Sequence, residues 1–347
     1  MTGLTPVGRD NSRGLVIVGN DGGTNVGASL LRAARSCGLS AVLVDARRAF
    51  AAPRIVGRVN WWLRGHRPTR LASFGREVAD VCRSVAPRWL VTTGLAPVDR
   101  RAIEAVNALG VETINYLTDD PWNPAFRSAW FLEALGGYRR VATVRRRNIR
   151  DLEAQTTADI EYVPFGFDPE IFYPPPTDRP ADSGGPARVL FAGGADHDRV
   201  PYIQALLAAG IDVALYGDYW DRYAETRASA RGHLMPDALR ESIWNAAVCL
   251  CLVRRANRDG HSMRTFEVPA AGGCMVVEDT DEHREIFGED GEAVRYFNGL
   301  DEEVAVTQEL LACPERRHAL AAASHRRVSE GGCTYEHRLR QILRLGS

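Results

Sequence analysis

The sequence has no lysine, no C-x-x-C pair and no long apolar run, and each absence excludes a class of protein. Seven Cys residues are scattered along the 347 residues. Cys249 and Cys251 belong to one expected strand, whose alternate side chains point to opposite faces and cannot share a metal ion. Reduced thiols in a cytoplasmic protein are the simplest interpretation. No run is apolar enough to span a bilayer, and residues 1–14 lack the pattern of a signal peptide.

An excess of charge of either sign is also missing. All 43 positively charged residues are Arg, and 44 Asp and Glu residues bring the net charge to −1, which argues against general nucleic-acid binding. Arg suits bidentate recognition of phosphate or carboxylate. A codon bias toward GC explains the Arg content equally well, and we favour that explanation. An apolar content of 45% is typical of a soluble globular protein, and the length favours two domains.

Both halves of the chain begin with an apolar strand, a glycine-rich loop and a helix. The first half has G-L-V-I-V-G at 14–19 and N-D-G-G-T-N-V-G at 20–27, and the second has R-V-L-F-A at 188–192 and G-G-A-D-H-D-R at 193–199. Such βαβ units build parallel sheets that are covered by helices. The sequence therefore predicts an α/β protein with two Rossmann-like domains that face each other across a cleft.

A Pro-rich segment marks the boundary between these domains. We predict a disordered tail over 1–13, a first domain over 14–173, a linker over 174–186 and a second domain over 187–332. A C-terminal helix within 333–347 is a candidate to return to the first domain. Further strands are expected at 39–45, 88–93, 111–117, 138–144, 160–164, 211–217, 246–253, 274–277 and 293–297.

The first glycine-rich loop leaves two interpretations open. The second strand ends in Asp45, an acidic position that suits the ribose of a dinucleotide, so an NAD-dependent enzyme is one alternative. The glycines of the loop do not form G-x-G-x-x-G, which weakens that alternative. We favour a loop whose backbone a substrate approaches closely.

The segment 46–70 combines the pair Trp61-Trp62 with five Arg between Arg54 and Arg70 and with no acidic residue. It can form a flap that binds the acceptor or touches a membrane peripherally, because Trp and Arg suit interfaces. The favoured alternative is an amphipathic helix that packs its Trp side chains on the domain.

A carboxylate pair follows the strand at 111–117. Asp119 and Asp120 lie at the carboxyl end of a parallel strand, the edge where α/β proteins bind ligands. They can equally cap the next helix, and the sequence does not decide between the two roles.

The stretch Asp259–Asp279, D-G-H-S-M-R-T-F-E-V-P-A-A-G-G-C-M-V-V-E-D, carries the densest set of polar groups. It places an acid, a glycine turn, a His and an Arg ahead of a short helical run, and then Glu267. Glycine turns occur in every α/β protein, and a buried Glu can simply cap a helix. The complete set at fixed spacing, between the strands at 246–253 and 274–277, favours a phosphate-and-sugar site.

Several segments together resemble the CgeB-like branch of the group 1 (GT-B) glycosyltransferases. They are R-V-L-F-A-G-G at 188–194, A-L-Y-G at 214–217, R-T-F-E-V-P-A-A-G-G at 264–273, T-Y-E-H-R at 334–338, Y-L-T-D-D-P-W at 116–122 and Y-V-P-F-G-F-D-P-E-I-F-Y-P at 162–174. The resemblance covers nearly the whole chain. It implies a nucleoside-diphosphate sugar as donor, no cofactor and no metal. The acceptor is left open between a small molecule, a polysaccharide and a protein.

The resemblance also implies roles for individual residues. Glu267 would accept hydrogen bonds from the ribose diol, and Arg264 with Arg199 would neutralise the diphosphate, helped by the N-termini of two helices. Donor binding would use Gly193, Gly194, Arg199, Gly217, Arg264, Thr265 and Glu267. Acceptor binding would use Gly22, Gly23, Thr24, Asn25 and Trp122.

The chain departs from the family at the position of a second glutamate, which is Asp259 here. Asp is one methylene shorter, so its reach to the sugar is in doubt, and His261 is an alternative contact. The stereochemical outcome stays open, and a nucleotide-sugar-binding or regulatory protein without transferase activity is an alternative. Candidate catalytic residues are Asp259 and His261, with Asp21, Asp119 and Asp120 as possible bases.

Overall fold

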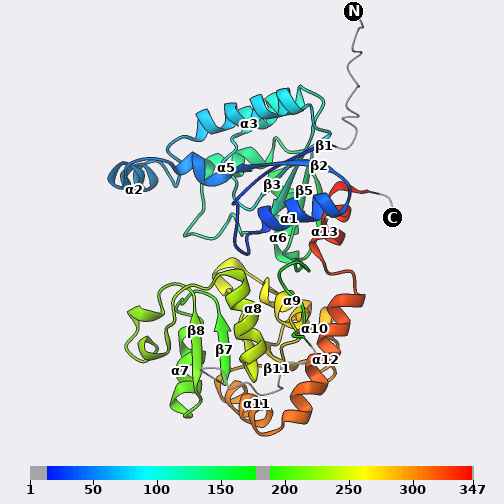
Figure 1. Ribbon diagram of the computed structural model, residues 1–347. Coiled ribbons are helices and arrows are strands. Elements are labelled where there is room, and N and C mark those ends of the chain that lie inside the picture. Colours follow the sequence, from blue (N-terminus) through cyan, green and yellow to red (C-terminus); the bar gives the residue numbers. More distant parts are fainter. Residues whose placement is uncertain (1–13, 177–187, 346–347) are drawn as a thin grey trace, which may run out of the picture. The chain divides into compact units, whose positions relative to one another are not determined.

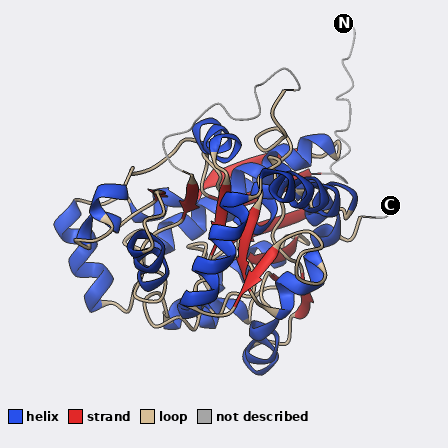
Figure 2. Ribbon diagram, turned by 90° about the horizontal axis from the view of Figure 1, so that it is seen from below, coloured by secondary structure: helices blue, strands red, loops and turns tan. Residues whose placement is uncertain are grey.

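The computed structural model describes residues 14–176 and 188–345, which form two compact units (Figure 1). The N-terminal unit takes in the chain up to Pro164 together with the chain from Leu339 onward. The C-terminal unit is Phe165–Arg338. Each unit contains one parallel sheet flanked by helices, as Figure 2 shows in red and blue.

The sheet of the N-terminal unit has six strands in the order β2-β1-β3-β4-β5-β6, and all neighbouring strands are parallel. The strands are β1 Gly14–Gly19, β2 Ser40–Asp45, β3 Trp89–Thr93, β4 Glu112–Leu117, β5 Arg140–Thr143 and β6 Asp159–Tyr162. The helices are α1 Val26–Ser36, α2 Arg54–Leu63, α3 Leu71–Val85, α4 Arg100–Asn107, α5 Ala129–Leu135 and α6 Arg146–Gln155, with a short 3-10 helix at Ala46–Phe50.

Strand β1 shows why the sheet is central. All six of its residues are buried, because helices cover both faces of a parallel sheet. Val16 and Val18 belong to a core cluster with Phe74 and Val78 of α3, and that cluster also includes side chains of α4 and α5. Figure 1 shows α3 and α5 along one face of this sheet.

The sheet of the C-terminal unit has five parallel strands in the order β11-β10-β9-β7-β8. Its strands are β7 Val189–Ala192, β8 Val213–Tyr216, β9 Val248–Cys251, β10 Met275–Glu278 and β11 Arg295–Phe297. Its helices are α7 Val200–Ala208, α8 Pro236–Asn245, α9 Arg264–Ala270, α10 Asp281–Phe287, α11 Leu300–Ala312, α12 Pro314–Glu330 and the start of α13 Tyr335–Leu343, with 3-10 helices at Trp220–Arg222, Arg227–Ser229 and Arg255–Asn257.

The division between the units falls at Pro164, ahead of the linker that the sequence predicts. The residues after Pro164 are tied to the C-terminal unit: Arg338 donates to the Phe165 carbonyl at 2.9 Å, Phe167 forms a bridge with Thr334, and Phe172 is buried. Of the predicted linker only 174–176 is described, and the predicted tail 1–13 lies outside the described residues. Helices α5 and α10 were not predicted from the sequence, and α3 begins at Leu71, whereas the sequence predicts a helix over Arg76–Ala86.

None of the helices in the described parts of the chain combines the length and the apolar character that crossing a bilayer requires.

Candidate functional site

The candidate donor site lies at the carboxyl edge of the C-terminal sheet, where two glycine loops touch. Gly193 N–H donates to the Tyr216 carbonyl at 2.8 Å, and Ala195 N–H to the Asp218 carbonyl at 2.8 Å, so the loops after β7 and β8 are joined. Gly217 has a φ of +124°, and a Cβ there would lie 2.6 Å from the Gly193 backbone. Only glycine allows both this backbone conformation and this approach. Gly193, Gly194 and Gly217, the glycines predicted to bind the donor, therefore lie together at this edge.

Arg199 lies at this edge, but its guanidinium is used within the protein. Nη1 donates to the Gly194 carbonyl at 3.3 Å, Nη2 to the Leu252 carbonyl at 3.2 Å and Nε to the Val253 carbonyl at 3.4 Å. Burial, with the nearby charge of Arg254, lowers the pKa of Arg199. The Arg199 side chain therefore connects the β7 loop to the end of β9, and its positive charge is buried beneath this edge. The sequence prediction had Arg199 contact the diphosphate directly.

Arg264 and Glu267 form an ion pair on α9. The two side chains are three residues apart on the helix, and Glu267 is only 1% exposed. Arg264 Nε also donates to the Ala192 carbonyl at the end of β7, at 3.2 Å. The pair therefore sits beside the glycine loops, with part of the Arg264 side chain exposed. A buried carboxylate held by a single cation keeps capacity to accept further hydrogen bonds.

Arg254 is a further cation at this edge that the sequence prediction did not select. It follows β9, it is half-exposed, and its guanidinium lies near Asp196 with Nε 3.6 Å from the carboxylate. A Cβ on Gly194 would lie 3.8 Å from Arg254 Nη2, so this guanidinium borders the glycine loop. The sequence could have indicated Arg254 through its position, because it directly follows the strand expected at 246–253 and so lies at the ligand-binding edge of the sheet.

Thr265 and His283 form a buried hydrogen-bonded chain between the start of α9 and the end of β10. The Thr265 hydroxyl accepts from Ser262 N–H at 3.0 Å and lies 3.0 Å from His283 Nε2. His283 Nδ1 lies 2.8 Å from the Glu278 carbonyl and donates to it. Burial lowers the pKa of His283 to about 4, so the ring is neutral at pH 7. Thr265, predicted as a donor-binding residue, instead supports the start of α9.

His261 is 2% exposed, and both of its ring nitrogens are engaged. Nε2 accepts from Phe165 N–H at 3.2 Å, which leaves the proton on Nδ1, 2.5 Å from the Glu282 carboxylate. A Cβ on Gly260 would lie 2.5 Å from the carboxyl carbon of Glu282, so the glycine makes room for this pair. The contacts of His261 are those of a residue that positions the chain, and they leave neither nitrogen facing a ligand.

Asp259 is half-buried in the turn after β9, where its N–H donates to the Arg254 carbonyl at 3.2 Å. Its charge acts on Arg199 and opposes the lowering of the Arg199 pKa by burial. The predicted acid thus lies beside Arg254 and close enough to Arg199 to act on its charge.

The predicted acceptor loop lies at the carboxyl edge of the N-terminal sheet. Gly22 and Gly23 have positive φ values of 75° and 59°, and the Asn25 side chain closes the turn by donating to the Gly22 carbonyl at 2.7 Å. Asp21 is exposed, and Thr24 is half-buried. Gly19 and Gly27 bring β1 and α1 together, since a Cβ on either would lie 3.0 Å from the other's Cα.

Asp119 and Asp120 differ in their surroundings although they are adjacent. Asp119 is half-buried, beside Gly94 at the end of β3. Asp120 is 1% exposed and accepts from Trp122 N–H at 3.0 Å, which closes a local turn; it does not cap the next helix, because the N-cap of α5 is Ser128. Trp122 is half-buried and packs against the core cluster of this unit. Asp119 is therefore the more accessible of the two predicted bases.

Asp45, the position that suggested a dinucleotide site, is occupied by a neighbouring side chain. Arg47 donates from Nε to both carboxylate oxygens at 2.9 Å and from Nη2 at 2.6 Å, and these bonds lower the pKa of Asp45. Asp45 also caps the 3-10 helix that follows β2. Through these contacts Asp45 has a structural role at the end of β2, in place of the ribose contact that a dinucleotide site would need.

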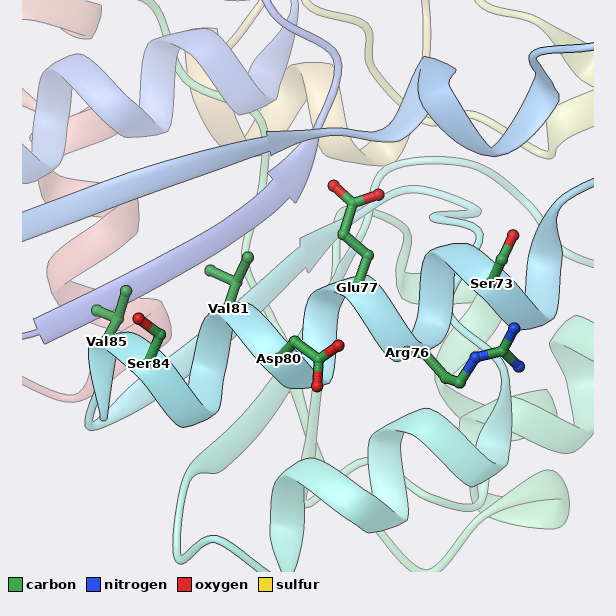
Figure 3. Close-up of a pocket in the computed structure, with 7 residues that line it drawn as sticks. All are labelled: Ser73, Arg76, Glu77, Asp80, Val81, Ser84 and Val85. Atoms are coloured by element: carbon green, nitrogen blue, oxygen red, sulfur yellow. The ribbon is translucent and has the colours of Figure 1, made fainter.

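A surface hollow of about 550 Å³ lies elsewhere, along α3. Figure 3 shows its lining residues on successive turns of that one helix: Ser73, Arg76, Glu77, Asp80, Val81, Ser84 and Val85. None of them belongs to either candidate set. Among the described residues, no three or more His, Cys, Asp and Glu side chains are grouped as metal ligands.

Comparisons with known proteins place this fold. A family model described as "Glycosyl transferase-like" matches residues 199–344. No curated protein matches the sequence. A sucrose-phosphate synthase from Thermosynechococcus elongatus is 13% identical with a TM-score of 0.67, and the alignment covers 96% of this chain and 98% of that one.

Two further solved structures carry bound nucleotide sugars. HepE of Anabaena, in complex with UDP-glucose, is 12% identical with a TM-score of 0.64 over 95% of this chain and 98% of that one. A trehalose-6-phosphate protein from E. coli, bound with UDP-2-fluoro glucose, is 12% identical with a TM-score of 0.61 over 95% and 98%. The two Rossmann-like sheets are thus those of the GT-B glycosyltransferase fold.

Proposed function

We propose that this chain is a glycosyltransferase that moves a sugar, a hexose in our interpretation, from a nucleoside-diphosphate sugar to an acceptor. The observation that carries the proposal is the Arg264–Glu267 pair beside the joined glycine loops at the carboxyl edge of β7, β8 and β9. Arg199 and Arg254 add positive charge at the same edge. A buried carboxylate, the half-buried backbone of the glycine loops and several guanidiniums match the diol and the diphosphate of such a donor.

The donor would be held by groups with distinct tasks. Glu267 accepts hydrogen bonds from the ribose diol, and Arg264 orients Glu267 while facing the diphosphate. Arg254 contacts the diphosphate from the β9 loop, and buried Arg199 adds a longer-range field. Neutralising the leaving diphosphate in this way would make a metal unnecessary. The UDP sugars bound to the matched structures make UDP-glucose the first donor to test.

The acceptor would be received by the N-terminal unit. Asp21 and the loop Gly22–Asn25 are exposed or half-buried, and Asp119 with Trp122 lies at the same sheet edge. Of the predicted bases, Asp21 and Asp119 are accessible enough to take a proton from an acceptor hydroxyl. The assignment to the CgeB-like branch and to the cytoplasm belongs to the same proposal.

Calorimetric titration with UDP, GDP, dTDP and CDP tests the donor site. Glu267→Gln, Arg264→Gln and Arg254→Gln should each weaken binding of the preferred nucleotide about tenfold or more, because each removes a charge-assisted hydrogen bond of about 1.5–3 kcal/mol. Glu241→Gln and Arg231→Gln, exposed residues of the same unit, are the matched controls. Unchanged affinity in Glu267→Gln and Arg264→Gln would remove these roles.

A second candidate function is nucleotide-sugar binding without transfer. The engagement of both His261 nitrogens and the shorter Asp259 favour it, because they leave the donor edge of this unit with few groups for acid–base chemistry. Release of free UDP from UDP-glucose, with water or a panel of acceptors, separates the two functions. A chain that binds the donor and never releases UDP is a binding protein.

A further inference from the structure

Helix α2 presents an apolar face to the solvent. The exposed side chains of Ile55, Val56, Val59, Trp62 and Leu63 follow the i, i+4, i+7 spacing of one helix face, and Ile55, Trp62 and Leu63 are 78%, 72% and 79% exposed. An amphipathic helix of a globular protein normally turns its apolar stripe toward the core. The sequence favoured inward packing of both Trp residues, and Trp62 contradicts that expectation.

The helix is held in place from its opposite side. Trp61 is half-buried, and its ring centroid lies 4.9 Å from that of His66 and 6.2 Å from that of Phe50. His66 in turn is anchored to the body of the N-terminal unit: Nδ1 lies 3.0 Å from the Arg127 carbonyl, and Trp130 Nε1 donates to the His66 carbonyl at 3.2 Å. The outward apolar face is thus presented by a fixed helix. Figure 1 shows α2 away from the sheet of its unit, at the left edge of the view.

The charge around this face has one sign. Residues 46–70 contain seven Arg and neither Asp nor Glu. Arg47 and Arg48 are paired with Asp45 and Glu77, which lie outside that segment. Arg58, Arg64 and Arg67 are exposed and form no ion pair with any described residue. The apolar face is therefore bordered by uncompensated positive charge.

We propose that α2 binds the surface of an anionic lipid bilayer, lying in the plane of the interface with its apolar face inserted among the lipids. An exposed apolar stripe that contains Trp, bordered by Arg, is the chemistry of an interfacial helix. A negatively charged lipid surface satisfies both features at once. A second copy of this chain would oppose Arg with Arg across a two-fold interface, so the charge disfavours self-association through α2. The inference does not depend on the proposed transferase activity.

Co-sedimentation with vesicles tests this proposal on the full chain without any nucleotide sugar. Vesicles of phosphatidylcholine with a minor share of phosphatidylglycerol should bind the protein, those of phosphatidylcholine alone should bind it far less, and added salt should weaken the binding. The double variant Trp62→Gln/Leu63→Gln should lower the partition coefficient at least about tenfold, because it removes two inserted apolar side chains. Arg58→Gln/Arg64→Gln should weaken binding and reduce its salt dependence.

The matched control is Leu109→Gln, an exposed apolar side chain of the same unit that lies outside α2 and should not change the partition. All substituted side chains are exposed, and urea unfolding checks that the variants stay folded. The proposal is overturned if the anionic vesicles do not bind the protein, or if both double variants bind as the wild type does. It is equally overturned if sedimentation shows a dimer that the Trp62→Gln/Leu63→Gln variant abolishes.

Discussion

At the scale of single residues, Glu303 on α11 is a fully buried carboxyl group whose oxygens accept no hydrogen bond from the described residues. Burial, with the charge of Glu278 in addition, raises the pKa of Glu303 to about 9. The side chain is therefore neutral at pH 7 in the folded protein, while the same group ionises near pH 4.3 in an unfolded chain.

This difference makes stability depend on pH. The folded pKa of Glu303 is higher than the unfolded one. The contribution of this group to the free energy of unfolding is therefore fully present below the unfolded pKa and is lost as the pH rises toward about 9. Glu303→Gln removes the titrating group and should flatten the decline, with a gain that is larger near pH 8 than near pH 5 by roughly 4 kcal/mol, about 1.4 kcal/mol for each pH unit. Urea unfolding at the two pH values measures it. Asp301→Asn, an exposed acid in the same helical turn, should leave the wild-type slope intact.

The sequence predicted which residue types lie at the candidate site and on which loops, but it predicted less well where their side chains point. Arg199, Arg264 and Glu267 do gather at one sheet edge, because the ends of parallel strands share an edge and the spacing fixed which loops they occupy. Spacing does not say where a guanidinium points. Arg199 and Thr265 turn into the protein because buried carbonyl, amide and imidazole groups there need partners, and those groups come from distant segments.

At the scale of elements, the contact between the β7 and β8 loops sets the shape of the donor edge. Gly217→Ala would place a Cβ against the Gly193 backbone in a left-handed conformation, whereas Gly210, with a φ of 75°, has open space where its Cβ would be. Strain at positive φ is about 1–2 kcal/mol, and overpacking adds about 1–3 kcal/mol. Gly217→Ala should therefore lose more stability in urea than Gly210→Ala and also weaken UDP binding. Equal losses in the two variants would contradict the close contact.

Elements with a strong apolar pattern were predicted well. The strand at Gly14–Gly19 was predicted to the residue, because a fully buried parallel strand is a continuous apolar run. Helices α5 and α10 were missed, since seven-residue helices show little periodicity and α10 is mostly polar. The existence of α2 was predicted, but the side of it that faces solvent depends on the anchoring of Trp61 by His66, which no local pattern encodes.

At the scale of the whole molecule, the repeated strand–loop–helix pattern was enough to predict two Rossmann-like domains, and the matched structures have the same fold. The boundary between the two units was harder to predict from the sequence. Proline content suggested 174–186, but tertiary contacts of the residues after Pro164 decide the division. A Pro-rich composition indicates where a chain can form an extended linker, but tertiary packing determines to which unit each residue belongs.

The end of the chain offers a test of how the N-terminal unit is completed. From Leu339 onward α13 belongs to that unit, with Leu339, Ile342 and Leu343 buried. The Ile342 carbonyl accepts from Arg140 of β5 at 2.7 Å, and Arg140 also pairs with Glu112 of β4 at 2.8 Å. Deleting 339–347 should remove three buried apolar side chains and expose the surface that they cover, together with the Arg140 guanidinium, at a cost on the order of 5 kcal/mol to this unit.

Hydrogen exchange of individual strands is the suitable measurement, because it separates the two units within one chain. The truncated chain should exchange the amides of β5 and β6 faster while those of β9 and β10 stay protected. Arg344→Gln is the control, since it removes an exposed ion pair with Asp159, 2.6 Å long, that is worth about 1 kcal/mol or less. Unchanged protection of β5 and β6 after truncation would mean that the N-terminal sheet is stable without the last five residues of α13, Leu339–Leu343.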